Sequence, residues 1–371
     1  MAHMKILLVG ISTRALAQSA VAAGFEIISL DFFGDCDQPA KAEVHTLVLE
    51  SGQPPELTAL ARSARELIPN VDWVVVEAGL ENEPALLELC PSEKRWGNSA
   101  EAVAGVRDLD RIRDVLRGTG MRLPEVIHPG EPLPAEGHYL VKDPAHSGGI
   151  GVHEWDGHTP PRSQQILQSF EAGELASACF IADGSQARLL GLTRQYAGEP
   201  KLSAPSFVWC GNVAPWGDLE LERVVLDAIE ALSESFGLVG LNGIDFIVQN
   251  GNPTLLEVNP RPPASFELFE RLLGVNAFQL HINACLNQLP DSLPRIPIGL
   301  AWGKGILYAH ADLQIGDTHC WAKQGISDIP HSGEQIMAGA PVCTILANGR
   351  DAIDCWAAVL AKASHWPLDA I

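Results

Sequence analysis

The sequence predicts an α/β protein that begins with a parallel sheet, continues with two α+β segments and ends with a small β-rich region. A strand, a helix and a second strand follow one another within the first 31 residues, which is the pattern of a β-α-β unit. Two apolar runs flank an Asn-Gly turn sequence near residue 250, as expected for a β-hairpin. The 371 residues exceed one comfortable hydrophobic core, so we expect two or three domains. We place them at residues 4–95, 96–290 and 291–371.

The first domain is expected to be Rossmann-like. Residues 1–3 have the composition of a cloning remnant before Met4 and are left out of the fold prediction. Gly24 is expected to end the first helix, and the Gly-x-Gly-x-x-Gly motif of dinucleotide-binding domains is missing from the sequence. The predicted elements are strands at 6–10, 25–31 and 71–77 and a helix at 15–23.

Candidate substrate-binding residues follow the strands of this sheet. Ligands of open parallel sheets collect at the carboxyl ends of the strands, where Glu77 and Asn82 lie. Ser12, Thr13 and Arg14 precede the first helix, whose N-terminus would attract an anion. Ser12 or Thr13 could equally well only cap that helix, so both interpretations stay open.

The second domain is predicted to begin with a helix over 100–116. A further helix is predicted over 272–289, because apolar residues recur at helical spacing there. In the C-terminal region, the apolar runs at 303–309 and 339–347 predict strands.

A lysine and a glycine-rich loop stand together in the second domain. Lys142 lies on a predicted strand at 139–142, and the loop follows within ten residues. Glycines let main-chain N–H groups approach phosphate oxygens closely, and the lysine would add a positive charge beside them. By itself such a loop is more typical of an ordinary hairpin turn. The candidate phosphate-binding loop residues are His146, Ser147, Gly148, Gly149 and Gly151.

The hairpin near residue 250 carries the most informative side chains. Glu257, Asn259 and Arg261 stand at alternate positions and so share one face of a strand, and Asp245 lies twelve positions before Glu257 on the preceding strand. Folding the hairpin would place Asp245 beside Glu257. Two carboxylates and an amide oxygen are ligands that Mg²⁺ prefers, and Arg261 could hold a phosphoryl or carboxylate oxygen. The structural alternative is a buried acid pair neutralised by Arg261.

These motifs together resemble the ATP-grasp superfamily of carboxylate-amine ligases and biotin-dependent carboxylases, and most of all the predicted ATP-dependent carboligases related to biotin carboxylase. In that family, an acidic residue and a later Glu-x-Asn-x-Arg motif bind magnesium and the transferred phosphate. The resemblance implies that Asp245, Glu257 and Asn259 bind Mg²⁺ and that Arg261 and Lys142 are catalytic. It also implies a pre-ATP-grasp domain at the N-terminus and two ATP-grasp subdomains after it.

The segment 166–174 resembles the linker between the two ATP-grasp subdomains. By this resemblance, the backbone at Gln168 and Ser169 meets the adenine, Phe170 packs on the ring and Glu174 binds the ribose. An exposed acid without a role is the alternative for Glu174. Many relatives also carry a second phosphate-binding lysine where this chain has Arg107-Asp108-Leu109-Asp110-Arg111, so Arg107 or Arg111 could replace it.

Composition narrows the class of partner. The net charge of −21 disfavours nucleic acids and anionic membranes. We see no apolar run of membrane-spanning length and no signal peptide, and the eight cysteines include no Cys-x-x-Cys pair. We therefore expect a cytoplasmic protein that binds small molecules, either as a monomer or as a homodimer.

The function implied by the resemblance is ATP-dependent ligation. ATP and Mg²⁺ would activate a substrate carboxylate as an acylphosphate, which an amine substrate then attacks. Biosynthesis of a one-carbon-carrying cofactor is a candidate pathway. A non-catalytic protein that binds ATP or ADP as a regulator, and a carboxylase that uses bicarbonate, are the alternatives.

Overall fold

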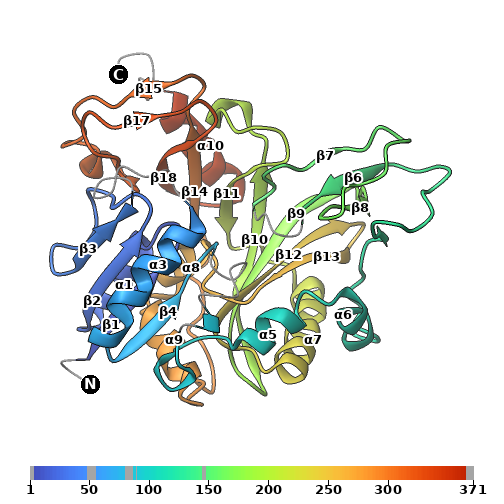
Figure 1. The fold of residues 1–371 in the computed structure, drawn as a ribbon, viewed down its shortest axis with the longest axis horizontal. Helices are drawn as coiled ribbons and strands as arrows, with labels where there is room; N and C mark the ends of the chain where they lie inside the picture. Colours follow the sequence, from blue (N-terminus) through green and yellow to red (C-terminus); the bar gives the residue numbers. More distant parts are fainter. Residues whose placement is uncertain (1–3, 48–55, 80–86, 89, 144–147, 365–371) are drawn as a thin grey trace.

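The computed structural model describes residues 4–47, 56–79, 87–88, 90–143 and 148–364, and Figure 1 shows the chain. The candidate residues Asn82, His146 and Ser147 lie outside the described residues.

The N-terminal domain is built on a parallel sheet, as predicted. Its four strands run in the order β3-β2-β1-β4, and every pair is parallel. One face packs on helix α3 through Val9, Ile28 and Leu60, while residues such as Leu8 on the other face share a core with the rest of the chain. The elements are β1 (Lys5–Val9), α1 (Arg14–Ala22), β2 (Glu26–Asp31), β3 (Glu43–Thr46), α3 (Leu57–Leu67), the 3-10 helix η1 (Ile68–Asn70) and β4 (Trp73–Val76).

An eight-stranded antiparallel sheet forms the centre of the molecule, with strand order β13-β12-β9-β10-β11-β14-β18-β16. Residues alternate between its two faces: Phe180 of β9 packs with helix α7, and Ile181 packs with helices α8 and α9. The elements are β9 (Glu174–Asp183), β10 (Ala187–Ala197), η4 (Pro200–Leu202), β11 (Trp209–Ala214), α7 (Leu219–Phe236), β12 (Val239–Gln249), β13 (Asn252–Asn259), α8 (Phe266–Leu273) and α9 (Ala277–Cys285).

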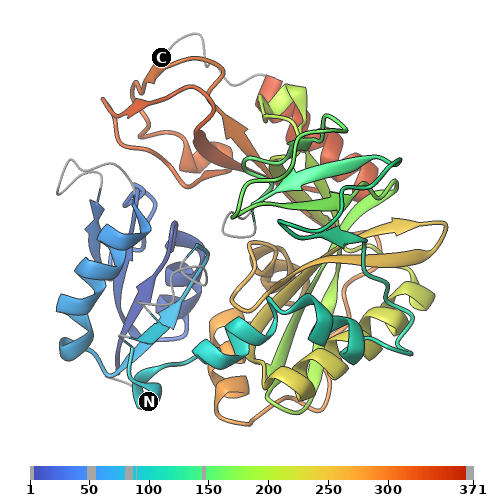
Figure 2. The ribbon, with the colours of Figure 1, turned by 45° about the vertical axis from the view of Figure 1, so that its right-hand side comes forward.

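A smaller antiparallel sheet lies beside the β12–β13 hairpin (Figure 2), with strand order β5-β8-β6-β7. A small core that includes Leu167 and Val141 holds it together. Its strands are β5 (Val126–Ile127), β6 (Tyr139–Lys142), β7 (His153–Glu154) and β8 (Ile166–Ser169).

The C-terminal region continues the large sheet. Strand β14 pairs with β11, and β18 pairs with β14, so the sheet runs across residue 291, where the sequence suggested a boundary. Helix α10 covers these strands, and Cys355 and Val359 of the helix are fully buried. The elements are β14 (Ala301–Tyr308), β15 (Leu313–Gln314), η5 (Ala322–Gln324), β16 (Ile326–Ser327), β17 (Gln335–Ile336), β18 (Pro341–Gly349) and α10 (Ala352–Ser364).

Two predicted helices were wrong in length. The helix expected over 100–116 is split into α5 (Ala100–Gly105) and α6 (Leu109–Val115), because the Asp108 side chain accepts hydrogen bonds from the N–H groups of residues 110 and 111 and starts a new helix. The helix expected over 272–289 is also divided. Gly274, with φ of 64°, ends α8, and Asn276 caps α9. The 3-10 helix η3 (Ser92–Lys94) precedes α5.

A buried ion network ties the N-terminal domain to the rest of the chain. Arg14 of α1 is fully buried and pairs with Glu267 of α8 at 2.7 Å and with Asp328 of the C-terminal region at 2.9 Å. Lys304 of β14 reaches the other oxygen of Glu267 at 3.1 Å. The chain therefore forms one body, in which helix α1 of the N-terminal domain packs against helix α9 beside the large sheet (Figure 1).

No helix in the described part of the chain combines the length and the apolar character that crossing a membrane requires.

Candidate active site

The two predicted metal-binding carboxylates lie side by side. Asp245 on β12 and Glu257 on β13 are direct cross-strand partners, as the sequence predicted. The turn between the strands has Asn250 and Gly251 at φ of 53° and 78°, the backbone of a two-residue hairpin turn. The turn pairs residues 246–249 with 252–255. A β-bulge between Asp245 and Phe246 then shifts the register by one residue, which places Asp245 opposite Glu257 instead of Leu256.

Asn259 and Arg261 extend this site. The Asn259 amide donates to the Asp245 carboxylate at 2.9 Å, and Arg261 donates to the Asn259 amide oxygen at 2.9 Å. Burial raises the pKa of Asp245, while Asn259 and Arg261 oppose that shift. The carboxylate is thus half-buried among donors that favour its charged form.

Gln195 of β10 is a further member of the site that sequence reasoning missed. Its side-chain amide donates to Oδ1 of Asp245 at 2.6 Å. Gln195 reaches across strand β9, where the residue paired with Asp245 is the small Ser177. No motif in the sequence marks this glutamine, because its role depends on the order of strands in the sheet.

Lys142 approaches the acids from the smaller sheet. Its ammonium donates to the Gln168 side-chain oxygen at 3.0 Å. Burial lowers the pKa of Lys142, and the charges of Glu257 and Asp245 oppose that shift, which places the three groups in one neighbourhood. A pocket of about 370 Å³ lies here between the two sheets, and its lining includes Arg107, Lys142, Gly149, Gln168, Leu256 and Glu257.

The glycine loop has the backbone that only glycine adopts readily. Gly148, Gly149 and Gly151 have φ of 67°, 79° and 76°. A side chain on Gly149 would overlap the main-chain carbonyl of Phe207, whereas one on Gly148 would meet nothing within 4 Å. Gly149 also lines the pocket, so its lack of a side chain lets the backbone border the space where a phosphate is expected.

The segment expected to bind the nucleoside joins the two sheets, because β8 belongs to the smaller sheet and β9 to the larger. Of its residues, Gln168 lines the pocket, whereas Ser169, Phe170 and Glu174 are not among the described residues of the lining. Phe170 stacks on His138, with ring centroids 4.4 Å apart. Glu174 forms a close ion pair with Arg194. Roles of Phe170 and Glu174 in binding adenine and ribose stay predictions.

The structure separates the two arginines proposed to replace the second phosphate-binding lysine. Arg107 lines the pocket and lies 3.4 Å from the Glu257 carboxylate. Arg111 instead stacks on the Phe236 ring of helix α7, at 4.9 Å from its centroid. Arg107 is therefore the candidate for contacting a phosphate.

Comparison with known proteins agrees with this geometry. Residues 110–265 match the family model of the ATP-grasp domain. This segment is an ATP-grasp domain. It contains Lys142, Gln168, Asp245, Glu257, Asn259 and Arg261.

Other similar proteins match nearly the whole chain. The chain is 25% identical over 362 residues to the formate-dependent phosphoribosylglycinamide formyltransferase of a Synechococcus species, covering 88% of this chain and 86% of that protein. The crystal structure of an L-amino acid ligase from Bacillus licheniformis is similar with a TM-score of 0.71 at 14% identity, covering 98% of this chain and 97% of the ligase. The structure of the N5-carboxyaminoimidazole synthetase of Staphylococcus aureus, complexed with ADP, is similar with a TM-score of 0.70 at 14% identity. The match covers 98% of this chain and 97% of the synthetase. The likeness to the two structures extends the shared fold to both ends of the chain.

The ATP-grasp site fits a magnesium ion bound together with a nucleotide. Asp245, Glu257 and Asn259 offer hard oxygen ligands, and a cation would stabilise the charged form of the Asp245 carboxylate against the effect of burial. In the described residues, no group of three or more His, Cys, Asp or Glu side chains could hold a metal ion without other ligands. Phosphate oxygens would have to complete the coordination, as is usual for Mg²⁺ at nucleotide sites.

The N-terminus of helix α1, ahead of the ATP-grasp domain, is not open to an external anion in the way the sequence suggested. The Thr13 main-chain N–H donates to Asp31 at 3.0 Å and the Thr13 hydroxyl donates to the same oxygen at 2.8 Å, so an internal carboxylate occupies the position. Arg14 is engaged by Glu267 and Asp328. The alternative that a side chain caps the helix is also not observed, because the Thr13 side chain makes no capping bond. A substrate role for Ser12, which is half-buried, stays a prediction.

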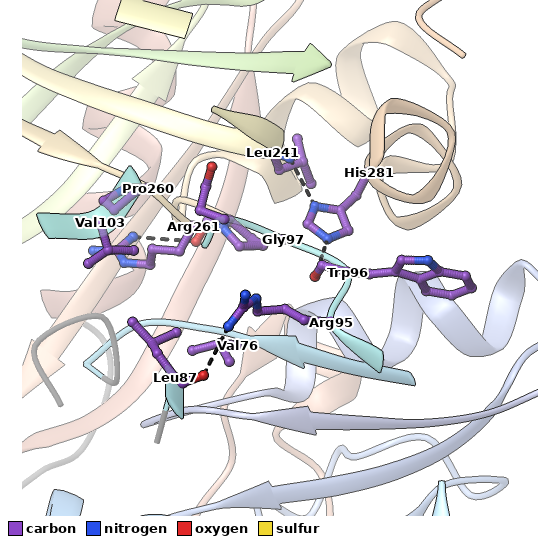
Figure 3. A pocket seen from close by; sticks show the side chains of 12 residues that line it. Val76, Leu87, Arg95, Trp96, Gly97, Val103, Leu241, Pro260, Arg261 and His281 are labelled. Carbon is purple, nitrogen blue, oxygen red and sulfur yellow. Dashed lines mark hydrogen bonds between the residues drawn. The ribbon is translucent and has the colours of Figure 1, made fainter. Parts of the chain in front are cut away.

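Glu77 connects the N-terminal sheet to the ATP-grasp site. It directly follows β4 and is 5% exposed, and its charge interacts with Arg261 and with Asp31. The neighbouring Val76 and Arg261 line a small cavity of about 10 Å³, which has room for about one water molecule (Figure 3). The carboxyl end of β4 therefore lies close to Arg261.

Proposed function

We propose that this protein is an ATP-dependent ligase that activates a substrate carboxylate as an acylphosphate and joins it to an amine. The observation that carries the proposal is the convergence of Asp245, Glu257, Asn259 and Arg261 with Lys142 in an ATP-grasp domain, next to the pocket that Lys142 and Glu257 line. The L-amino acid ligase with the same fold and the formate-dependent relative are named for reactions of this kind.

In the proposed reaction, a carboxylate oxygen of the substrate attacks the γ-phosphorus of ATP. The bond from that phosphorus to the β–γ bridging oxygen breaks, and ADP leaves. The amine nitrogen then attacks the carbonyl carbon of the acylphosphate, the bond from that carbon to the phosphate oxygen breaks, and the nitrogen loses a proton. Inorganic phosphate is the second product.

The chain's residues would orient and stabilise these charges. Lys142 and the main chain of the glycine loop hold the phosphates in line with the attacking oxygen. Arg261 stabilises charge on the transferred phosphoryl group and on the tetrahedral intermediate. A magnesium ion at Asp245, Glu257 and Asn259 would neutralise phosphate oxygens. Gln195 holds Asp245 in place through its hydrogen bond.

The physiological setting is also part of the proposal. We propose a cytoplasmic enzyme that contributes to the biosynthesis of a one-carbon-carrying cofactor, and the name of the formate-dependent relative supports a link to one-carbon chemistry. A carboxylase that uses bicarbonate is the second candidate, favoured by the fold shared with the carboxyaminoimidazole synthetase.

The test is ADP release against pools of carboxylates and amines, with mass spectrometry of the product. Glu257→Gln should keep the fold and abolish ADP release, while Glu234→Gln on the surface of α7 should behave like the parent. A bicarbonate-dependent product without an amine would favour the carboxylase. Unchanged turnover of Glu257→Gln would refute the metal site.

Arg261→Ala separates a ligase from a regulator. Arg261 is proposed to act on charge that develops during transfer, so the variant should bind ATP nearly as well as the parent, while its turnover should fall by on the order of a hundredfold or more. In a protein that only senses nucleotide, the same change should weaken binding and there would be no turnover to lose.

A further inference from the structure

An aspartate, a histidine and a cysteine meet on one turn of the C-terminal region, outside the ATP-grasp domain. Nδ1 of His319 lies 2.9 Å and 2.8 Å from the two carboxylate oxygens of Asp317. Nε2 of the same ring lies 3.1 Å from Sγ of Cys320. The imidazole therefore stands between a carboxylate and a thiol, and none of these three groups takes part in the proposed ligase reaction.

The backbone of the turn holds the three groups together. Thr318 and Trp321, at its two ends, are 6% and 8% exposed, and the Trp321 main-chain N–H donates to the Thr318 carbonyl at 3.0 Å. His319 and Cys320 are the two residues between these buried ends, and Cys320 is partly exposed. Asp317 also accepts a hydrogen bond from the main-chain N–H of His319 at 3.0 Å. The turn thus leaves the sulfur within reach of a small molecule.

The carboxylate of Asp317 decides which nitrogen of the imidazole carries the hydrogen. Hydrogen bonds from the main chain and from the side chain of His319 lower the pKa of Asp317, so this group is charged at neutral pH and can only accept. Nδ1 therefore donates, and Nε2 turns its lone pair to the thiol of Cys320. An imidazole in this position can take the thiol proton, which leaves a thiolate, the nucleophilic form of cysteine.

Buried thiols elsewhere in the chain are kept protonated. Cys285 also lies near an imidazole, with its sulfur 3.8 Å from Nε2 of His281. That nitrogen donates to the main-chain carbonyl of Trp96 at 3.2 Å, so it has no lone pair for a thiol proton. Burial raises the pKa of six thiols: Cys90, Cys179, Cys210, Cys285, Cys343 and Cys355.

Cys36 is the accessible thiol with which Cys320 can be compared. It is more exposed than Cys320. Partial burial of its sulfur and the charges of Asp35 and Asp37 raise the pKa of Cys36, and its thiol donates to the main-chain carbonyl of Pro330 at 3.5 Å. If exposure alone set the rate, Cys36 would react before Cys320, whereas the imidazole predicts the opposite order.

We infer that Cys320, together with His319 and Asp317, is a nucleophilic site that forms a mixed disulfide with low-molecular-weight disulfides. The Cys320 thiolate attacks one sulfur of the small disulfide, so that a bond from Sγ to that sulfur forms and the original S–S bond breaks. The leaving thiolate takes the proton that the His319 imidazole received, and departs as a thiol. Cys320 is oxidised and one half of the disulfide is reduced, and a thiol reductant reverses the reaction. This inference does not rest on the proposed ligase function.

Peptide mapping by mass spectrometry after exposure to glutathione disulfide tests the inference on the full chain at neutral pH. The mixed disulfide at Cys320 should form at least about tenfold faster than the one at Cys36, because the rate follows the thiolate fraction of the attacking thiol. Dithiothreitol should then remove it. Both cysteines are measured in the same molecule, so a general loosening of the fold would raise both rates.

Two variants test the roles of the neighbouring groups. His319→Asn removes the proton acceptor and should slow the reaction of Cys320 by about tenfold or more, while the rate at Cys36 stays the same. Asp317→Asn removes the carboxylate that orients the ring and should act in the same direction. His158→Asn is the matched control, because His158 is also exposed and lies 3.4 Å from Asp156; it should leave both rates unchanged.

Three results would overturn the inference. In the parent chain, a reaction at Cys36 as fast as that at Cys320 would show that exposure decides the rate. An unchanged rate at Cys320 in His319→Asn would show that the imidazole takes no part. Slowing of both cysteines together in the variants would show that the substitutions act through the fold and not on the thiol.

Discussion

Replacing Glu267 by glutamine should destabilise the protein through the buried ion network. The Glu267 carboxylate lies 2.7 Å from Arg14 and 3.1 Å from Lys304, and the three side chains are 8%, 1% and 5% exposed. Although burial by itself would raise it, the two cations hold the pKa of Glu267 well below its usual range. Glutamine keeps the shape of the side chain and removes the one carboxylate that contacts both cations, so that Arg14 keeps only its pairs with Asp328 and Asp37.

The expected loss is about 3–5 kcal/mol in the free energy of unfolding, the range seen when one partner of a buried ion pair is removed. It should be measured by urea unfolding followed by circular dichroism. Asp354→Asn serves as the control, because the Arg350–Asp354 pair on α10 is exposed and its removal should have little effect. A loss below about 1 kcal/mol for Glu267→Gln would refute the reasoning, because an exposed pair contributes that much.

The difference in the free energy of unfolding between the parent and Glu267→Gln should also depend on pH, which gives a second check. The folded-state pKa of Glu267 is lowered, so its stabilisation is present above the pKa of an unfolded glutamate and is lost as the pH falls through the folded-state pKa. The difference between parent and variant should therefore stay constant from neutral pH down to about pH 5 and shrink only in stronger acid. A difference that disappears already at mildly acidic pH would contradict the network.

Three further changes probe the ATP-grasp site. Gln195→Leu removes one of the donors to Asp245, the proposed magnesium ligand, and should raise the magnesium concentration for half-maximal ADP release about tenfold or more. An unchanged magnesium requirement would remove Gln195 from the site. Arg107→Ala should raise the KM for ATP in steady-state assays, whereas Arg111→Ala should not. A KM that rises only in Arg111→Ala would show that Arg111, and not Arg107, contacts the phosphate. Gly149→Ala should weaken nucleotide binding in calorimetry, whereas Gly157→Ala, with a similar φ of 84° but open space around it, should not; equal losses would point to backbone strain alone.

The sequence by itself determined the part of the site that local geometry controls. Alternation along one strand and an Asn-Gly turn predicted that Asp245 and Glu257 lie on paired strands, because both depend on residues close in the chain. The β-bulge between Asp245 and Phe246, which places the two acids directly opposite each other, is visible only in the structure. The β-α-β unit at the N-terminus was predictable for the same reason. The helices at 100–116 and 272–289 were overextended, because Asp108 and Asn276 interrupt the apolar pattern only through their capping bonds.

The tertiary structure alone decided which distant groups meet. Gln195 reaches Asp245 only because β10 lies two strands from β12 with Ser177 between them, and this strand order has no signature in the sequence. Arg14 appeared to be an anion ligand until Glu267, 253 positions later, proved to be its buried partner. Unpaired acceptors such as Oε1 of Glu77 can be recognised only when every neighbour is in place, because hydrogen bonding is a property of the folded surroundings and not of the residue type.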